Sequence, residues 1–207
     1  EELRHELVEM AGLVSKALQR ATVALLQADL AAAEAVISDD EVINRMREAI
    51  DERAIDLIAL QQPVATDLRT IVAGLRINAD LERMGDLARN IAKIARARYP
   101  DPAVPAPLRA TIEQMDRVAR QLLAKAAQVV ADRDVELARE LDHDDDEMDT
   151  LHRQLLVAML DERAPTGVEA AIDVALLGRY YERFADHAVS IADRIVYLVT
   201  GSYSVGT

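Results

Sequence analysis

Residues 82–92 read Glu82-Arg83-Met84-Gly85-Asp86-Leu87-Ala88-Arg89-Asn90-Ile91-Ala92, and residues 182–192 read Glu182-Arg183-Phe184-Ala185-Asp186-His187-Ala188-Val189-Ser190-Ile191-Ala192. The two stretches lie 100 positions apart and share the pattern E-R-x-x-D-x-A-x-x-I-A. A repeat of this length indicates two copies of one structural unit. Both copies keep a helical stripe of apolar residues, which explains folding. Both also keep two carboxylates four residues apart, which predict a further role.

The repeat extends along the whole chain and divides it into two halves. At an offset of 105 positions Asp29 matches Asp134, and after the second helix the offset becomes 100. Proline occurs at 63, at four positions within 100–107, and at 165, so the stretches between these places are free to be helical. We predict an all-α fold of two tandem three-helix bundles, at residues 1–99 and 105–201. The six helices are expected near residues 2–28, 30–60, 66–98, 107–132, 134–162 and 166–200.

Capping residues stand at several of the predicted helix ends. Asp29 and Asp134 precede the second and fifth helices, and Thr66 and Thr166 stand at the starts of the third and sixth. Short polar side chains of this kind accept hydrogen bonds from the free N–H groups of a first helical turn. Gly201 suits a helix end because glycine adopts the left-handed backbone conformation there. We therefore expect these five residues to cap their helices.

The composition excludes several classes of protein. The 207 residues include 51% hydrophobic but only 3% aromatic residues, with no cysteine and a net charge of −13. This charge argues against general nucleic-acid binding, which needs cations to neutralise phosphates. The lack of cysteine excludes disulfides and thiolate metal sites. Because the sequence also lacks a long apolar run and a signal-peptide pattern, we expect a cytoplasmic protein without direct membrane insertion.

The apolar seams place the repeated carboxylates on the outside of each bundle. Apolar residues at 77, 81, 84, 88, 91 and 95 alternate spacings of four and three, and the sixth helix repeats this seam. Such a seam faces the partner helices, and the neighbouring carboxylates then face outward. The second and fifth helices carry further polar pairs, at matching distances from the turns that follow. The residues predicted to form two level sets are Asp40, Asn44, Glu82 and Asp86 in the first half and Asp145, Asp149, Glu182 and Asp186 in the second.

Each set is a candidate metal site. Residues four apart on one helix have Cβ atoms about 5–6 Å apart, and oxygen ligands without cysteine favour divalent or trivalent cations such as Mg, Mn, Fe or Zn. Asn44 is neutral where Asp149 is charged, so the second site is expected to bind more tightly. The alternative is a solvated surface on which Arg83 and Arg183 neutralise the aspartates three residues further on.

The four histidines carry weaker signals. His5 and His143 each follow a glutamate at the E-x-x-H spacing found in di-iron bundles, but the seam points His143 away from the core. His152 and His187 are either outer contacts of the acidic sets or ordinary surface histidines. The sequence contains no Gly-rich phosphate loop, nucleophile elbow or H-E-x-x-H motif.

Several motifs together resemble the PhoU family of phosphate-signalling regulators, over residues 1–201. The chain departs from the pattern at Ala185, where the first half has Gly85, and at Gly167, where the first half has Asp67. The motifs are Asp40-x-x-x-Asn44, then Gln62-Pro63-Val64-Ala65-Thr66-Asp67-Leu68-Arg69, then Asp80-Leu81-Glu82-Arg83-Met84-Gly85-Asp86 and, in the second half, Tyr181-Glu182-Arg183-Phe184-Ala185-Asp186.

This resemblance implies a fold, a function and partners. It implies two three-helix bundles in a cytoplasmic protein that is not an enzyme. The protein would repress phosphate uptake and the phosphate-starvation response by coupling a phosphate ABC transporter, through its ATPase, to a sensor histidine kinase. The resemblance also implies a homodimer, and metal clusters on the eight residues named above.

Two other functions compete with this one. The first is a carboxylate-bridged metal-binding protein or metalloenzyme, such as an oxidase or a phosphatase. An enzyme of the ferritin-like kind would place its acids inside the bundle, whereas the seams place these outside. The second is an unrelated cytosolic metal store or helical scaffold, against which the family motifs argue.

Overall fold

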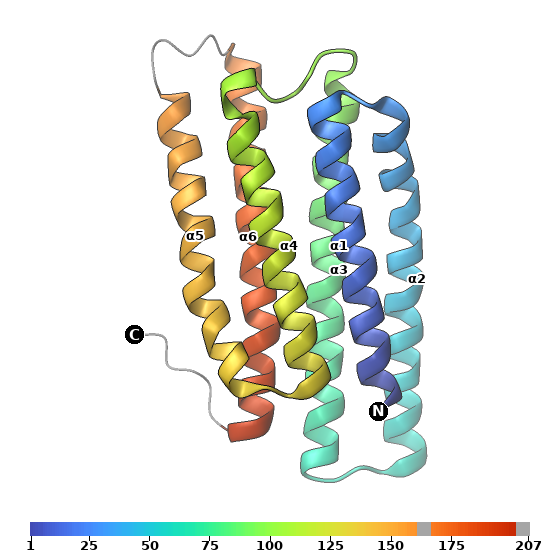
Figure 1. Cartoon of the computed structure of the whole chain (residues 1–207). Helices are drawn as coiled ribbons and strands as arrows, with labels where there is room; N and C mark the ends of the chain where they lie inside the picture. Colours follow the sequence, from blue (N-terminus) through green and yellow to red (C-terminus); the bar gives the residue numbers. More distant parts are fainter. Residues whose placement is uncertain (161–166, 202–207) are drawn as a thin grey trace.

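The computed structural model describes residues 1–160 and 167–201, and nearly all of them are helical (Figure 1). The all-α prediction is confirmed. Where the structure describes both the predicted and the observed bound, the two agree to within two residues. The predicted end of the fifth helix at 162 and start of the sixth at 166 lie outside the described residues. The elements are α1 (Glu2–Gln27), α2 (Leu30–Gln61), α3 (Thr66–Arg98), the 3-10 helix η1 (Ala106–Leu108), α4 (Arg109–Asp132), α5 (Val135–Met159) and α6 (Val168–Thr200).

The helices form two groups of three that pack side by side (Figure 1). The first group is α1, α2 and α3, and the second is α4, α5 and α6. Across the boundary α1 packs against α4 and α3 packs against α6, whereas α2 and α5 lie at the outer edges. The helices α3 and α6 run antiparallel, so the start of each lies beside the end of the other (Figure 1). This arrangement makes the α3–α6 interface pseudo-symmetric, because the two helices carry equivalent sequences.

One apolar core crosses both groups. Removing a large apolar side chain from water stabilises a fold by about 1.5–3 kcal/mol, which explains why these long helices associate. None of the described helices is both long and apolar enough to span a membrane. The predicted seams are confirmed, because all of their large residues are buried: Ile77, Leu81, Met84 and Ile91 in α3, and Leu177, Tyr181, Phe184 and Ile191 in α6.

The capping residues explain where several helices begin and end. The side chains of Asp29 and Asp134 accept hydrogen bonds from backbone N–H groups three residues on, at 2.9 Å and 3.0 Å. Gly201 ends α6 with a φ of 78°, which the absence of a side chain permits. The prediction for Thr66 is wrong: it is the first residue of α3, and the alanine before it takes the cap position without a side-chain hydrogen bond. Thr166 lies outside the described residues.

Candidate functional site

The predicted site residues form two groups, one on each bundle. Arg89 joins Asp40 of one helix to Asp86 of the next in the first group, and the charge of Asp186 acts on Asp145 of the adjacent helix in the second. Cluster one consists of Asp40 and Asn44 of α2 with Glu82 and Asp86 of α3, and cluster two consists of Asp145 and Asp149 of α5 with Glu182 and Asp186 of α6.

Small residues bring the helices together at both clusters. A Cβ atom added to Gly85 of α3 would lie 3.2 Å from two carbon atoms of Ile43 and 3.7 Å from Oδ1 of Asp40. The two helices therefore almost touch at cluster one. Ala185 occupies the equivalent position of α6 and is fully buried, so the second bundle accommodates the one extra carbon.

Cluster one contains a cation of its own. Arg89 of α3 donates through Nη1 to Asp40, and its Nη2 lies 2.6 Å from Oδ1 of Asp86. The amide of Asn44 also donates to Asp40, with 3.2 Å between Nδ2 and Oδ2. Asp40 is only 5% exposed, and a carboxylate so buried needs such partners. The prediction that all these carboxylates face outward is therefore wrong for Asp40, because α3 and Arg89 cover it.

Cluster two lacks this arrangement. Val189 stands where cluster one has Arg89, so no arginine lies between the carboxylates of α5 and α6 at this level. Oδ1 of Asp145 is buried and has no hydrogen-bond partner among the described residues. Burial, together with the charges of Asp186 and Asp149, raises the pKa of Asp145 to about 7. Four carboxylates are thus held close together without an internal cation, which raises the free energy of their ionised forms.

One arginine and one histidine approach the outer part of cluster two. Arg179 donates to Glu182, and Nδ1 of His152 lies 3.3 Å from the same carboxylate. Arg83 and Arg183, the predicted partners of Asp86 and Asp186, are exposed and form no ion pair within the described part of the chain. Asp86 is instead paired with Arg89, three residues after it.

The two clusters differ in how well they fit a metal ion. In residues 1–160 and 167–201, no three His, Asp or Glu side chains are already arranged to hold a metal. Cluster two nevertheless offers an unpartnered buried oxygen on Asp145 and a concentration of negative charge, which is the donor set that a hard cation requires. A cation would have to draw these side chains inward. In cluster one Arg89 already contacts the two aspartates that a metal would bind.

The histidines have ordinary partners. His5 and His143 are exposed, and the glutamates of their E-x-x-H pairs contact an arginine at 2.9 Å and a lysine at 3.6 Å. These pairs therefore do not build a di-iron site. His187 does not reach cluster two, and its Nδ1 lies 3.1 Å from Oδ1 of Asp80 in the first bundle. His152, by contrast, contacts cluster two directly.

Two polar contacts between the bundles escaped the sequence analysis. Asp80 of α3 binds His187 and Arg194 of α6. Burial alone would raise the pKa of Asp80, but the hydrogen bonds from His187 and Arg194 hold it below the ordinary value of 3.8. In the core, the hydroxyl of Tyr181 lies 2.6 Å from that of Thr22. Both contacts join residues more than 100 positions apart, and no sequence pattern pairs them.

Comparison with known proteins gives a consistent result over the whole chain. The family model of the PhoU domain matches residues 7–95 and 112–195. Phosphate-specific transport system accessory protein PhoU homolog 2 of Mycobacterium tuberculosis is 48% identical over 202 residues, which cover 98% of this chain and 95% of the relative. PhoU homolog 1 of Mycobacterium leprae is also 48% identical, over 98% of this chain and 91% of the relative.

Two solved structures share the fold. The crystal structure of PhoU from Pseudomonas aeruginosa superposes with a TM-score of 0.87 at 31% identity, covering 98% of this chain and 97% of that one. The phosphate transport system regulatory protein PhoU from Streptococcus pneumoniae gives 0.88 at 26% identity, with 98% and 96% covered. Both halves of the chain are therefore similar to these proteins in sequence and in fold.

Proposed function

The chain belongs to the PhoU family, and on that premise we propose that it is a non-enzymatic regulator of phosphate transport. In this proposal it represses phosphate uptake and the phosphate-starvation response by coupling a phosphate ABC transporter, through its ATPase, to a sensor histidine kinase. The observation that carries the proposal is the match of both repeats to proteins named as accessory proteins of the phosphate-specific transport system. The protein is expected to act in the cytoplasm and as a homodimer.

The interior of each bundle favours a binding protein over a metalloenzyme. In carboxylate-bridged enzymes the acidic ligands project into the bundle core. Here the inward positions nearest the clusters are Leu81 and Met84 in α3 and Tyr181 and Phe184 in α6, all almost completely buried. We therefore expect the purified protein not to hydrolyse phosphate esters.

Deletion of the gene tests the regulatory proposal. A reporter driven by a phosphate-starvation promoter should become active in abundant phosphate in the deletion strain, because the repressing protein is missing. Supplying the wild-type chain should silence the reporter again. If the reporter stayed silent in the deletion strain, under conditions in which the wild type makes the protein, the regulatory proposal would lose its basis.

Binding assays test the proposed partners separately. The purified chain should bind the cytoplasmic part of the sensor kinase and the transporter ATPase encoded in the same genome. A histidine kinase from an unrelated two-component system serves as the control and should not bind. Equal binding to both kinases would indicate non-specific association and would contradict the coupling role.

A second proposal concerns cluster two. We propose that Asp145, Asp149, Glu182 and Asp186 bind a divalent or trivalent cation of the Mg, Mn, Fe or Zn kind. The unpartnered oxygen of Asp145 and the four neighbouring carboxylates support this. Cluster one, with Asp40, Asn44, Glu82 and Asp86, is expected to bind a metal more weakly, because Arg89 already neutralises part of its charge.

A further inference from the structure

The two ends of the α3–α6 interface are related by the repeat. Each residue of α3 corresponds to the residue 100 positions later in α6, and the antiparallel packing joins the start of one helix to the end of the other (Figure 1). At one end, Arg98 of α3 contacts Asp173 and Glu169 of α6, with 2.7 Å between Nη1 of Arg98 and Oε2 of Glu169. A cation between two carboxylates therefore closes this end of the interface.

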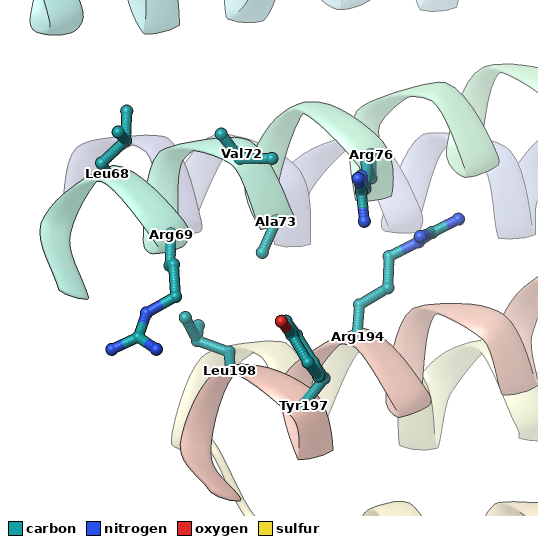
Figure 2. Close-up of a pocket in the computed structure, with 8 residues that line it drawn as sticks. All are labelled: Leu68, Arg69, Val72, Ala73, Arg76, Arg194, Tyr197 and Leu198. Carbon is teal, nitrogen blue, oxygen red and sulfur yellow. The ribbon is translucent and has the colours of Figure 1, made fainter. Parts of the chain in front are cut away.

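The opposite end of the interface is open. Leu198 takes the place of the arginine, while Arg69 and Ala73 take the places of the two carboxylates. A pocket of about 350 Å³ lies here instead of an ion pair. The residues that line the pocket are Leu68, Arg69, Val72, Ala73 and Arg76 of α3, with Arg194, Tyr197 and Leu198 of α6 (Figure 2).

The pocket has an apolar middle and basic ends. Figure 2 shows Arg69 at one end and Arg76 with Arg194 at the other. Between them lie Ala73 and the ring of Tyr197, whose hydroxyl points toward α3. A ligand that fills this space has to combine an apolar or flat body with at least one anionic group.

Within the described residues, two of the three arginines at the pocket have no carboxylate partner. Nε of Arg194 lies 2.7 Å from Oδ2 of Asp80, which also binds His187, so this guanidinium is held in place. Arg69 reaches a threonine hydroxyl at 3.4 Å. In the described part of the chain neither Arg69 nor Arg76 forms an ion pair, although the chain carries a net charge of −13. A basic concavity on an acidic protein attracts anions.

We propose that this pocket binds a small organic phosphate, with its phosphoryl group between Arg76 and Arg194 and its apolar body beside Ala73 and Tyr197. Guanidinium groups pair with phosphate oxygens through parallel hydrogen bonds, and a dianionic phosphoryl group can engage two arginines. The volume falls in the range of about 300–1,000 Å³ typical of small-ligand sites. A bare phosphate ion would leave the apolar middle uncovered. The inference goes beyond the regulatory role and does not depend on it.

Calorimetry with AMP as the probe tests this assignment on the full chain. Wild-type protein should bind AMP, and Arg76→Gln should weaken binding about tenfold, because one charge-assisted contact to phosphate is lost. Arg96→Gln removes an exposed arginine of the same helix outside the pocket and should leave the affinity unchanged. No binding by the wild type, or equal losses in both variants, would overturn the assignment. If inorganic phosphate bound as tightly as AMP, the proposal that the ligand carries an organic group would be overturned.

Transplanting the closed end of the interface into the pocket provides a second test. The variant Arg69→Glu, Ala73→Asp, Leu198→Arg rebuilds the ion pair of Arg98 at the pocket. It should lose AMP binding and keep its helical circular dichroism, because the same triad already packs at the other end. Undiminished AMP binding by this folded variant would show that the ligand lies elsewhere and would contradict the proposal. The single variant Arg76→Gln decides the question if the triple variant does not fold.

Discussion

Cluster one and cluster two occupy equivalent places on the two bundles, but the repulsion between their carboxylates is compensated differently. Cluster one combines three carboxylates with an amide and encloses the guanidinium of Arg89. Cluster two has four carboxylates, and Val189 stands at the position of that arginine. The first cluster is therefore partly neutralised from within, whereas the second has to be neutralised from outside or remain partly protonated. The comparison shows that one exchange, of arginine for valine, changes how the charge of a repeated acidic cluster is compensated.

Removing ligands from cluster two should have the largest effect on metal binding. Glu182→Ala with Asp186→Ala should abolish metal binding at the tighter site, because two of its four charged ligands are lost. Elemental analysis and calorimetry with Mg, Mn, Fe and Zn measure this. The fold should persist, because both side chains lie outside the core.

The matched control is the same pair of changes in cluster one, Glu82→Ala with Asp86→Ala. It should leave the metal bound at the tighter site, cluster two, unchanged. Equal metal content in all three proteins, or none in any of them, would mean that cluster two is only a solvated acidic surface.

Replacing Arg89 by valine makes cluster one resemble cluster two. Asp40 is nearly buried and would have only the Asn44 amide beside it. Leaving a buried charge without its partner costs about 3 kcal/mol, so the free energy of unfolding should fall by that amount in urea titrations. Adding Mn or Zn should recover part of the loss, because a cation can now take the place of Arg89.

Arg83→Val is the control for this change, because Arg83 is exposed on the same helix and has no ion pair in the described part of the chain. Its effect on the free energy of unfolding should stay within about 0.5 kcal/mol. Similar losses in the two variants would indicate that Arg89 acts through helix propensity rather than through Asp40.

The reverse exchange, Val189→Arg, should turn cluster two into a self-neutralised site. A guanidinium between Asp145 and Asp186 would compete directly with a metal ion. We therefore expect the affinity of cluster two for the metal to decrease by about tenfold to a hundredfold. Calorimetry with the tightest of the four metals provides the measurement. Val189→Met, of similar length but neutral, should bind nearly as the wild type does. An equal loss in both would point to crowding rather than charge.

Much of the fold could be predicted because its signals are local. Proline marks the turns, the seams of α3 and α6 define the buried faces, and Asp29 and Asp134 cap their helices. The repeat then fixes the grouping into two bundles. The exception at Thr66 has a local cause as well. The alanine before it adopts a positive φ of 47°, and the sequence did not indicate this turn geometry.

The sites were less predictable because their chemistry depends on contacts between helices. The level arrangement of the carboxylates followed from their distances to the turns. The burial of Asp40 did not, since it depends on how closely α3 approaches at Gly85. The aligned repeats contain Arg89 in one copy and Val189 in the other. The consequence of this difference depends on the contact between Arg89 and Asp40, which the sequence does not indicate. The α3–α6 pocket could not be predicted, because the apolar periodicity of the sequence does not indicate which helices of different bundles pack together.

The smallest effect is expected when the equivalent aspartates Asp40 and Asp145 are each replaced by asparagine. The two replacements should change the free energy of unfolding in opposite directions. Burial and neighbouring carboxylates raise the pKa of Asp145 to about 7, against 3.8 for an ordinary aspartate. The folded protein therefore binds this proton more tightly than the unfolded chain does. It follows that the stability of metal-free wild type should fall as the pH rises from about 4 to about 7. Asp145→Asn removes the titrating carboxylate, so the stability of this variant should not show the part of the decrease that Asp145 causes.

At pH 7 with a chelator present, Asp145→Asn should gain about 1 kcal/mol in the free energy of unfolding, because solvent screens part of the repulsion at a carboxylate that is not fully buried. Asp40→Asn should lose about as much, because Arg89 would lose a charged partner. Urea unfolding of both variants at pH 5 and pH 7 measures the two signs. If both variants gained stability, Arg89 would not be compensating cluster one. If both lost it, the carboxylates of cluster two would not be repelling one another, and the difference between the clusters would have to come from packing around Gly85 and Ala185.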